Sequence, residues 1–178
     1  MPELVLVNYA DDFLLMARSM AVLQKAGPVL VKAVGELPGG HFELKCKCEL
    51  KADEGFSFLG HQFQLHDGCV KVSPTKENED RFWKRLAELD ERVSKLVYSP
   101  EMPKKDAFPL AVEALARLAA FVQGWRAAFA ACDNPDRWLG NAQEEIAKYR
   151  KKLGISSYQL KASIDPTMIG PEDRYFYP

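Results

Sequence analysis

The stretch LVLVNYADDFLLM, residues 4–16, decides how this chain is interpreted, because it sets two adjacent acids between two apolar runs. Runs this short and this close together predict the two strands of a β-hairpin, with Asp11 and Asp12 at its tip. Adjacent carboxylates repel each other, and a fold keeps them on a rigid turn mostly where a cation or a proton uses them. Magnesium prefers such oxygen ligands. The alternative is an ordinary turn, since Asp is common in hairpin loops.

Four segments resemble landmarks of reverse transcriptases, and they occur in the same order. Tyr9-Ala10-Asp11-Asp12 in an apolar hairpin is similar to the palm active-site motif of that family. Residues 55–60, GFSFLG, resemble the primer-grip segment of group II intron and related bacterial reverse transcriptases. Residues 72–76, VSPTK, resemble the entry to their thumb domain. Residues 122–125, VQGW, are similar to the Gly-Trp signature of a later thumb helix in group II maturases.

The resemblance implies an α+β fold, with a partial polymerase palm (an antiparallel sheet with a helix) followed by a three-helix thumb. The expected domains are residues 1–72 for the palm part, 73–154 for the thumb and 155–178 for an irregular tail. In the family the tetrapeptide lies well inside the protein, after the fingers and the first half of the palm. We therefore expect this chain to be the C-terminal portion of such an enzyme.

Hydrophobic periodicity predicts a helix and a strand after the hairpin. Ser19 is a plausible N-cap for a helix to about residue 37, which Gly27-Pro28 should kink or split. Residues 42–51 alternate apolar and charged side chains, which is typical of a half-buried strand.

Two turns are predicted in the segment that follows. The phenylalanines change parity at Gly60, which indicates a β-bulge or a sharp bend there. Asp67-Gly68 is a strong hairpin signal, which would pair residues 61–66 with residues 69–72.

The second part of the sequence has helical periodicity. Ser73 as N-cap and Pro74 as first helical residue predict a helix whose apolar face is Phe82, Leu86, Leu89, Val93 and Leu96. Residues 98–106 are expected to form a loop, and residues 107–131 a second helix with inward Phe108, Leu115, Leu118, Val122 and Trp125. A third helix should open at Asn134-Pro135 and end at Gly154. The tail is expected to be irregular and packed by Tyr175, Phe176 and Tyr177.

The resemblance also assigns roles at the hairpin. Asp11 and Asp12 would be catalytic ligands of a two-magnesium site, with Asp11 the preferred candidate of the two. Tyr9 and Ala10 would shape the turn near the primer end and the incoming nucleotide. A third carboxylate comes from an earlier palm strand in the family, and the fingers also precede the motif. The site is therefore incomplete in this chain, which we expect to be inactive without an upstream fingers and palm segment.

A second group of residues would contact the primer. The backbone turn of Phe58, Leu59 and Gly60 would lie against the primer strand, unless these residues are only a core strand with a bulge. The sequence departs from the family at Asn8, where relatives carry a basic residue, and at His61, where they often have Phe. A lysine is expected after the palm helix, and neither Lys45 nor Lys47 can be assigned to it from the surrounding sequence.

Each of the remaining candidate sites also has a purely structural explanation. Trp125 would contact the duplex or pack in the core. The cluster of Lys148, Arg150, Lys151 and Lys152 would bind phosphate, although a helix C-terminus favours cations in any case. A zinc site can be imagined from Cys46, Cys48, Cys69, His61 and His66, but the cysteine spacing disfavours it and buried thiols are expected instead.

The composition gives little support to extensive nucleic-acid binding. Lys and Arg number 24 against 25 Asp and Glu, for a net charge of −1. No signal peptide is visible and no apolar run approaches the length of a membrane span, so we expect a cytoplasmic protein without a membrane partner. Two functions stay open. The chain is the catalytic-motif half of an RNA-directed DNA polymerase acting on an RNA template and a DNA primer, or a non-catalytic palm–thumb remnant that binds RNA or a protein.

Overall fold

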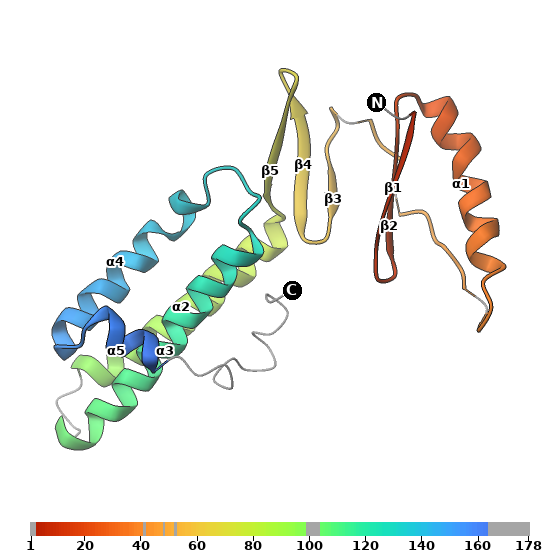
Figure 1. Ribbon diagram of the computed structural model, residues 1–178. Helices are drawn as coiled ribbons and strands as arrows, with labels where there is room; N and C mark the ends of the chain where they lie inside the picture. Colours follow the sequence, from red (N-terminus) through yellow and green to blue (C-terminus); the bar gives the residue numbers. More distant parts are fainter. Residues whose placement is uncertain (1–2, 41, 48, 52, 99–103, 164–178) are drawn as a thin grey trace. The chain divides into compact units, whose positions relative to one another are not determined.

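The structure, a computed structural model, describes residues 3–40, 42–47, 49–51, 53–98 and 104–163. These residues form two small antiparallel sheets and five helices, so the expected α+β class is confirmed (Figure 1). The chain divides into two compact units, Met1–Val70 and Lys71–Pro178. The palm and thumb identities of these units stay a prediction.

The first unit begins with the predicted hairpin. Strand β1 (Leu4–Tyr9) pairs antiparallel with β2 (Asp12–Ala17), from Leu4 opposite Ala17 to Tyr9 opposite Asp12. Helix α1 (Met20–Gly35) follows, and the Ser19 hydroxyl accepts a hydrogen bond from the backbone N–H of Val22, which confirms the predicted cap. Pro28 lies inside α1 and does not split it, because one missing N–H leaves the neighbouring turns of the helix bonded.

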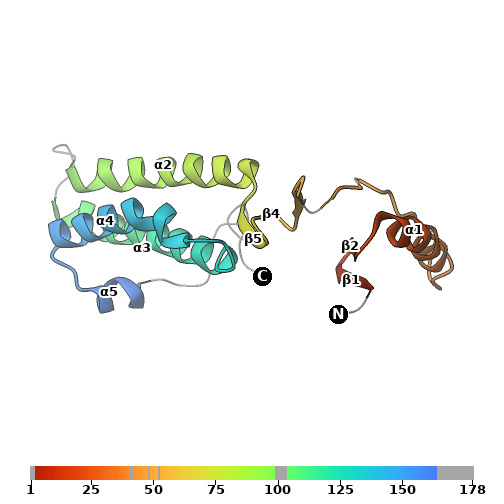
Figure 2. The same cartoon turned by 90° about the horizontal axis from the view of Figure 1, so that it is seen from above.

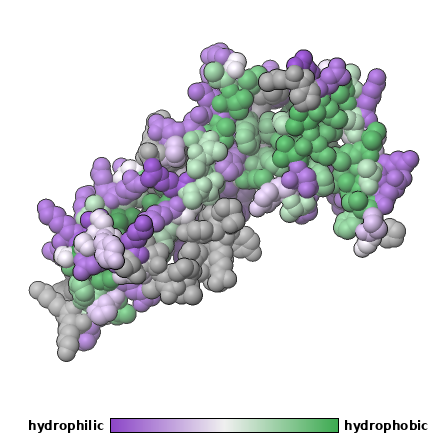
Figure 3. All heavy atoms as spheres, in the orientation of Figure 1, coloured by the Kyte–Doolittle hydropathy of each residue, from purple (hydrophilic) through white to green (hydrophobic). Residues whose placement is uncertain are grey.

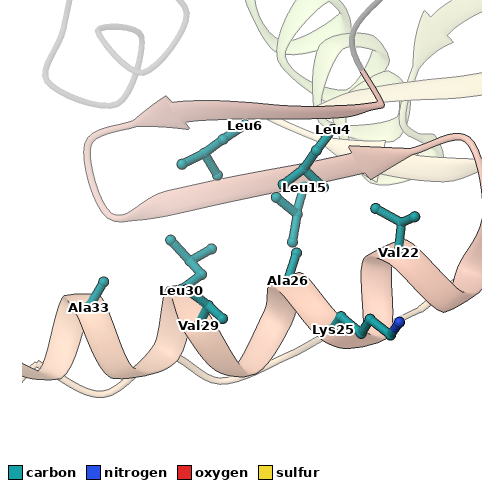
Figure 4. A pocket seen from close by; sticks show the side chains of 9 residues that line it. All are labelled: Leu4, Leu6, Leu15, Val22, Lys25, Ala26, Val29, Leu30 and Ala33. Carbon is teal, nitrogen blue, oxygen red and sulfur yellow. The ribbon is translucent and has the colours of Figure 1, made fainter.

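The hairpin and α1 pack through apolar side chains and enclose a groove of about 510 Å³ (Figure 4). The hairpin side chains that face the helix come from alternate positions of β1 and from β2, as the period of a strand requires. They are Leu4, Leu6 and Leu15, and the helix side chains across from them include Val22, Ala26 and Leu30.

The strand expected over residues 42–51 is wrong. None of the residues described in that interval, 42–47 and 49–51, belongs to a strand. Alternation produces two faces, but a strand also needs a neighbour whose backbone groups complete its hydrogen bonds. In the described part of the chain, neither sheet extends to this segment.

The second sheet has the order β3-β4-β5, with β3 (Phe56–Phe58), β4 (His61–His66) and β5 (Cys69–Pro74). Phe58 pairs with His61, so the sharp bend predicted at Gly60 is confirmed as the two-residue turn Leu59-Gly60, and the alternative of a β-bulge is wrong. Asp67-Gly68, with φ of 50° and 74°, forms the predicted turn between β4 and β5.

The second unit contains helices α2 (Lys76–Tyr98), α3 (Lys104–Ala128), α4 (Pro135–Leu153) and α5 (Ser157–Ala162) (Figure 2). The predicted cap at Ser73 is wrong because β5 continues to Pro74, and the Thr75 hydroxyl instead accepts from the N–H of Asn78 at 3.4 Å. Helix α4 has the predicted start, and Gly154, with φ of 69°, ends it as expected.

The boundaries of the loop and of the tail also differ from expectation. The loop expected over residues 98–106 is shorter, because α2 includes Tyr98 and α3 already begins at Lys104. The tail is not wholly irregular, since a capping box at Ser156 begins α5. The packing expected of Tyr175, Phe176 and Tyr177 lies outside the described residues.

The core of the second unit surrounds α3, which contacts α2, α4 and α5. Trp125 is fully buried, with its ring centroid 4.4 Å from that of Phe82 and 4.5 Å from that of Phe129. The other inward positions predicted on α3, Leu115, Leu118 and Val122, are buried, as are Phe82, Leu89 and Val93 on α2. The inward position predicted for Phe108 is wrong, because Phe108 is 45% exposed although Ala107 and Ala111 in the same turns of α3 are buried.

Helix α3 also corrects the expectation about apolar runs. By length and composition it could cross a membrane over Asp106–Ala128. Most of that stretch is buried inside the unit, as the central helix of a bundle is.

Candidate functional site at the β1–β2 hairpin

The two acids lie at a tight turn whose backbone is strained. Tyr9 pairs with Asp12, so Ala10 and Asp11 are the two central residues of the turn. Ala10 has a φ of 52°, in the left-handed region, which costs a residue other than glycine about 1–3 kcal/mol. The side-chain amide of Asn8 donates to the carbonyl oxygen of Ala10 at 3.1 Å and so closes the turn. Such local strain is typical of functional turns.

The acids leave the hairpin in different directions. Because Tyr9 and Asp12 lie opposite each other, their side chains share one face of the two strands. The same face carries Val5, Val7, Leu14 and Met16, and it is the face opposite the one that packs on α1. Asp11 projects from the exposed tip. The hairpin therefore presents one carboxylate at its end and the other beside Tyr9.

Asp12 has a cationic partner. The Nζ of Lys47 lies 3.2 Å from Asp12 Oδ1, and the side chains of Lys47 and Asp12 remain 83% and 44% exposed. An ion pair this open to solvent is worth roughly 0.2–1 kcal/mol. The contact involves Lys47, and neither Lys45 nor Lys47 is thereby assigned to the lysine that the family carries. Asp12 is thus held by a weak pair and stays accessible.

The donor set fits a magnesium site only in part. Asp11 and Asp12 supply the carboxylate oxygens that hard cations prefer. Among the described residues, no three His, Cys, Asp or Glu side chains are grouped so that they could hold a metal ion. The hairpin can contribute two ligands, and further donors have to come from outside this group.

The cysteines are less buried than expected. Cys46 and Cys69 are exposed, which makes the prediction of buried thiols wrong for them, whereas Cys132 is buried as predicted. Burial, with a smaller contribution from the charge of Asp133, raises the pKa of the Cys132 thiol to about 11. Cys48 lies outside the described residues.

The β3–β4 turn is the second predicted site, and it too is strained. Leu59 and Gly60 have φ of 49° and 77°, the pattern of a type I′ turn, in which Asn-Gly is the usual pair. A bulky residue with positive φ is a genuine outlier, and the Leu59 side chain is exposed at the tip. Behind the turn, the rings of Phe56 and Phe63 stack at 5.2 Å. A backbone turn of this kind fits the predicted primer grip, which stays a prediction.

The residues proposed for nucleic-acid binding on the helices are mostly engaged within the second unit. Trp125 lies in the core, so the structure supports its packing role over direct contact with a duplex. Lys148 pairs with Glu145, whose hydrogen bond raises the pKa of that lysine, and Lys152 Nζ lies 5.6 Å from the ring centroid of Tyr98. Arg150, Lys151 and Lys152 occupy the last turn of α4. Their phosphate-binding role stays a prediction.

Comparison of the chain with protein-family models, with curated proteins and with solved structures gives no match. The resemblance to reverse transcriptases therefore rests on the four sequence segments alone.

Proposed function

We propose that this chain is the C-terminal palm and thumb portion of an RNA-directed DNA polymerase of the group II intron type. It would carry out two-metal nucleotidyl transfer when fingers and an upstream palm complete it. The observation that supports this proposal is the strained two-residue turn at the tip of an apolar hairpin, which carries Asp11 and is followed directly by Asp12 at the start of β2.

In this proposal the hairpin positions the reacting groups. Two magnesium ions about 3.5–4 Å apart would supply the charge stabilisation for the attacking and leaving oxygens. Asp11 and Asp12 would hold them, together with a carboxylate from the upstream segment. Tyr9, on the same face as Asp12, would border the primer end and the nucleotide. The φ of Ala10 fixes the tip, so the two carboxylates are oriented before substrate arrives.

The proposed partners are an RNA template, a DNA primer and the upstream fingers and palm. The Val5 and Met16 face of the hairpin is where the upstream palm would pack, because α1 lies against the opposite face and these two side chains remain 37% and 39% exposed. Figure 3 shows apolar side chains gathered over the part of the molecule that holds β1, β2 and α1. The Leu59 turn and the last turn of α4 would contact the primer and phosphates. We place this enzyme in the cytoplasm.

A second candidate is a non-catalytic palm–thumb remnant that binds RNA or a protein. The Lys47–Asp12 pair favours it, because an acid neutralised by a lysine no longer needs a metal ion. The uncovered apolar face of the hairpin favours a protein partner over RNA within this alternative.

The test is primer extension with an RNA template and magnesium. The chain by itself is expected to be inactive, and addition of a fingers and upstream palm segment from a group II-type enzyme is expected to restore synthesis. Asp11→Asn should then lower the rate ~100-fold or more, because loss of a group that only supports a metal ligand already costs ~10- to 100-fold and Asp11 would be a direct ligand. Asp67→Asn is the matched control, because Asp67 is also an exposed acid in a two-residue hairpin turn, and it should leave the rate unchanged.

Folding is measured alongside activity. Both variants, and Asp11→Ala, should unfold within about 0.5 kcal/mol of the wild type, as exposed surface changes do. A folded reconstituted protein without polymerase activity would favour the remnant. A large loss of stability in Asp11→Ala would mean that the acids are structural.

A further inference from the structure

We propose that Lys47 is a latch on the metal-binding carboxylate, so that its ammonium group and a divalent cation occupy Asp12 in alternation. This inference rests on the proposed function, and it adds a means of regulation to the same site. The geometry behind it is the 3.2 Å separation of Lys47 Nζ and Asp12 Oδ1. A metal ion on that oxygen would stand within a few ångströms of the ammonium, and two cations so close repel each other.

The segment that carries Lys47 allows this lysine to move away from Asp12. Residues 42–47 and 49–51 are not part of a sheet, so moving Lys47 breaks no ladder of backbone hydrogen bonds. The lysine side chain is largely exposed and joins Asp12 across 35 positions of the sequence. A long side chain on a segment without strand pairing can therefore leave at the cost of one solvent-exposed ion pair.

The pair also explains how the hairpin keeps adjacent acids when no metal is bound. Asp11 and Asp12 repel each other at the turn, and a cation beside Asp12 offsets that repulsion. In the latched state Lys47 supplies this charge. In the released state the metal ion supplies it, and cation concentration sets the balance between the two states.

The test uses the whole chain and manganese as the probe. Manganese is paramagnetic, so when bound it broadens the backbone amide signals of residues 9–12 in the nuclear magnetic resonance spectrum. A titration of this broadening measures Kd values up to the millimolar range. Lys47→Gln should lower that Kd by ~1.5- to 5-fold relative to Lys45→Gln, the range that an exposed ion pair allows. Lys45 is the matched control because it lies on the same segment and is also exposed, whereas the described ion pair of Asp12 is with Lys47.

The outcomes separate the latch from the site beneath it. Equal Kd values for the two lysine variants, with clear broadening in both, would overturn the latch and leave the metal site intact. If the amides of residues 9–12 stay sharp in the wild type and in Lys47→Gln up to 50-fold excess, the metal site fails and the latch with it. Asp12→Asn in the Lys47→Gln background should abolish the gain, because it removes the oxygen for which the two cations compete.

Discussion

Replacing Phe82 by alanine is expected to destabilise the helical unit by about 3–5 kcal/mol. The side chain is fully buried, and its ring lies 4.4 Å from Trp125, 5.0 Å from Trp83 and 5.5 Å from Phe121. Truncation of a buried Phe costs about 3–5 kcal/mol, and ring contacts add about 0.5–1.5 kcal/mol each, so the upper half of the range is expected. Because a domain is stable by only about 5–15 kcal/mol, a loss of about 4–5 kcal/mol is roughly a quarter of the total or more.

The matched control is Phe108→Ala, which makes the same chemical change at a half-exposed position of α3. It should cost about 1 kcal/mol, since much of that ring is already in water. Urea titration followed by helical circular dichroism gives both values. In thermal unfolding, the Phe82 variant should melt about 12 °C lower or more.

Equal losses in the two variants would contradict this reasoning. They would show that Phe108 is as buried as Phe82, and that α3 presents a different face to the core from the one described here.

Three further predictions concern single groups. Leu59→Asn should raise stability by about 1 kcal/mol in thermal unfolding, because Asn tolerates the positive φ of this turn, and a loss would mean that the backbone is not strained. Burial, and then a hydrogen bond to Asp90, raise the pKa of Tyr149 to about 12, so the folded chain holds this proton more tightly than the unfolded chain. The contribution of this group to the free energy of unfolding should be complete below pH 10 and disappear between pH 10 and 12. The Tyr149→Phe variant should therefore lose no stability from this group over that pH range. An alkaline unfolding profile identical to that of the wild type would refute the assignment. A thiol reagent at pH 8 should modify Cys46 quickly and Cys132 only after unfolding, given a Cys132 pKa of about 11, whereas equal rates would contradict the burial.

The features that could be predicted from the sequence are those determined by a few neighbouring residues. Ser19 caps α1 because one hydroxyl reaches an N–H three residues later. Asp67-Gly68 and Gly154 adopt positive φ, which Gly takes without cost and Asp tolerates. The position of the two acids near the hairpin tip could also be predicted locally, since the apolar runs 4–7 and 13–16 are close enough in sequence to favour a hairpin.

The features that failed depend on distant partners. Residues 42–51 have the alternation of a strand, but no local signal says whether another strand will pair with them. Phe108 has a helical phase close to that of Leu115, yet Phe108 is exposed and Leu115 is buried, and this difference depends on tertiary packing and not on the local sequence. The contact of Lys47 with Asp12 joins positions 35 residues apart, so alternation of charge near Lys47 could not reveal it.

The hairpin also governs how this chain must be handled. Within the described residues, β1 and β2 form a sheet of only two strands, with apolar side chains on both faces. Such a ribbon is marginal in water, and its free edges invite strand pairing between molecules. Pairing between copies through residues 4–17, rather than through the helices, is therefore expected to increase with protein concentration and to limit the solubility of a preparation.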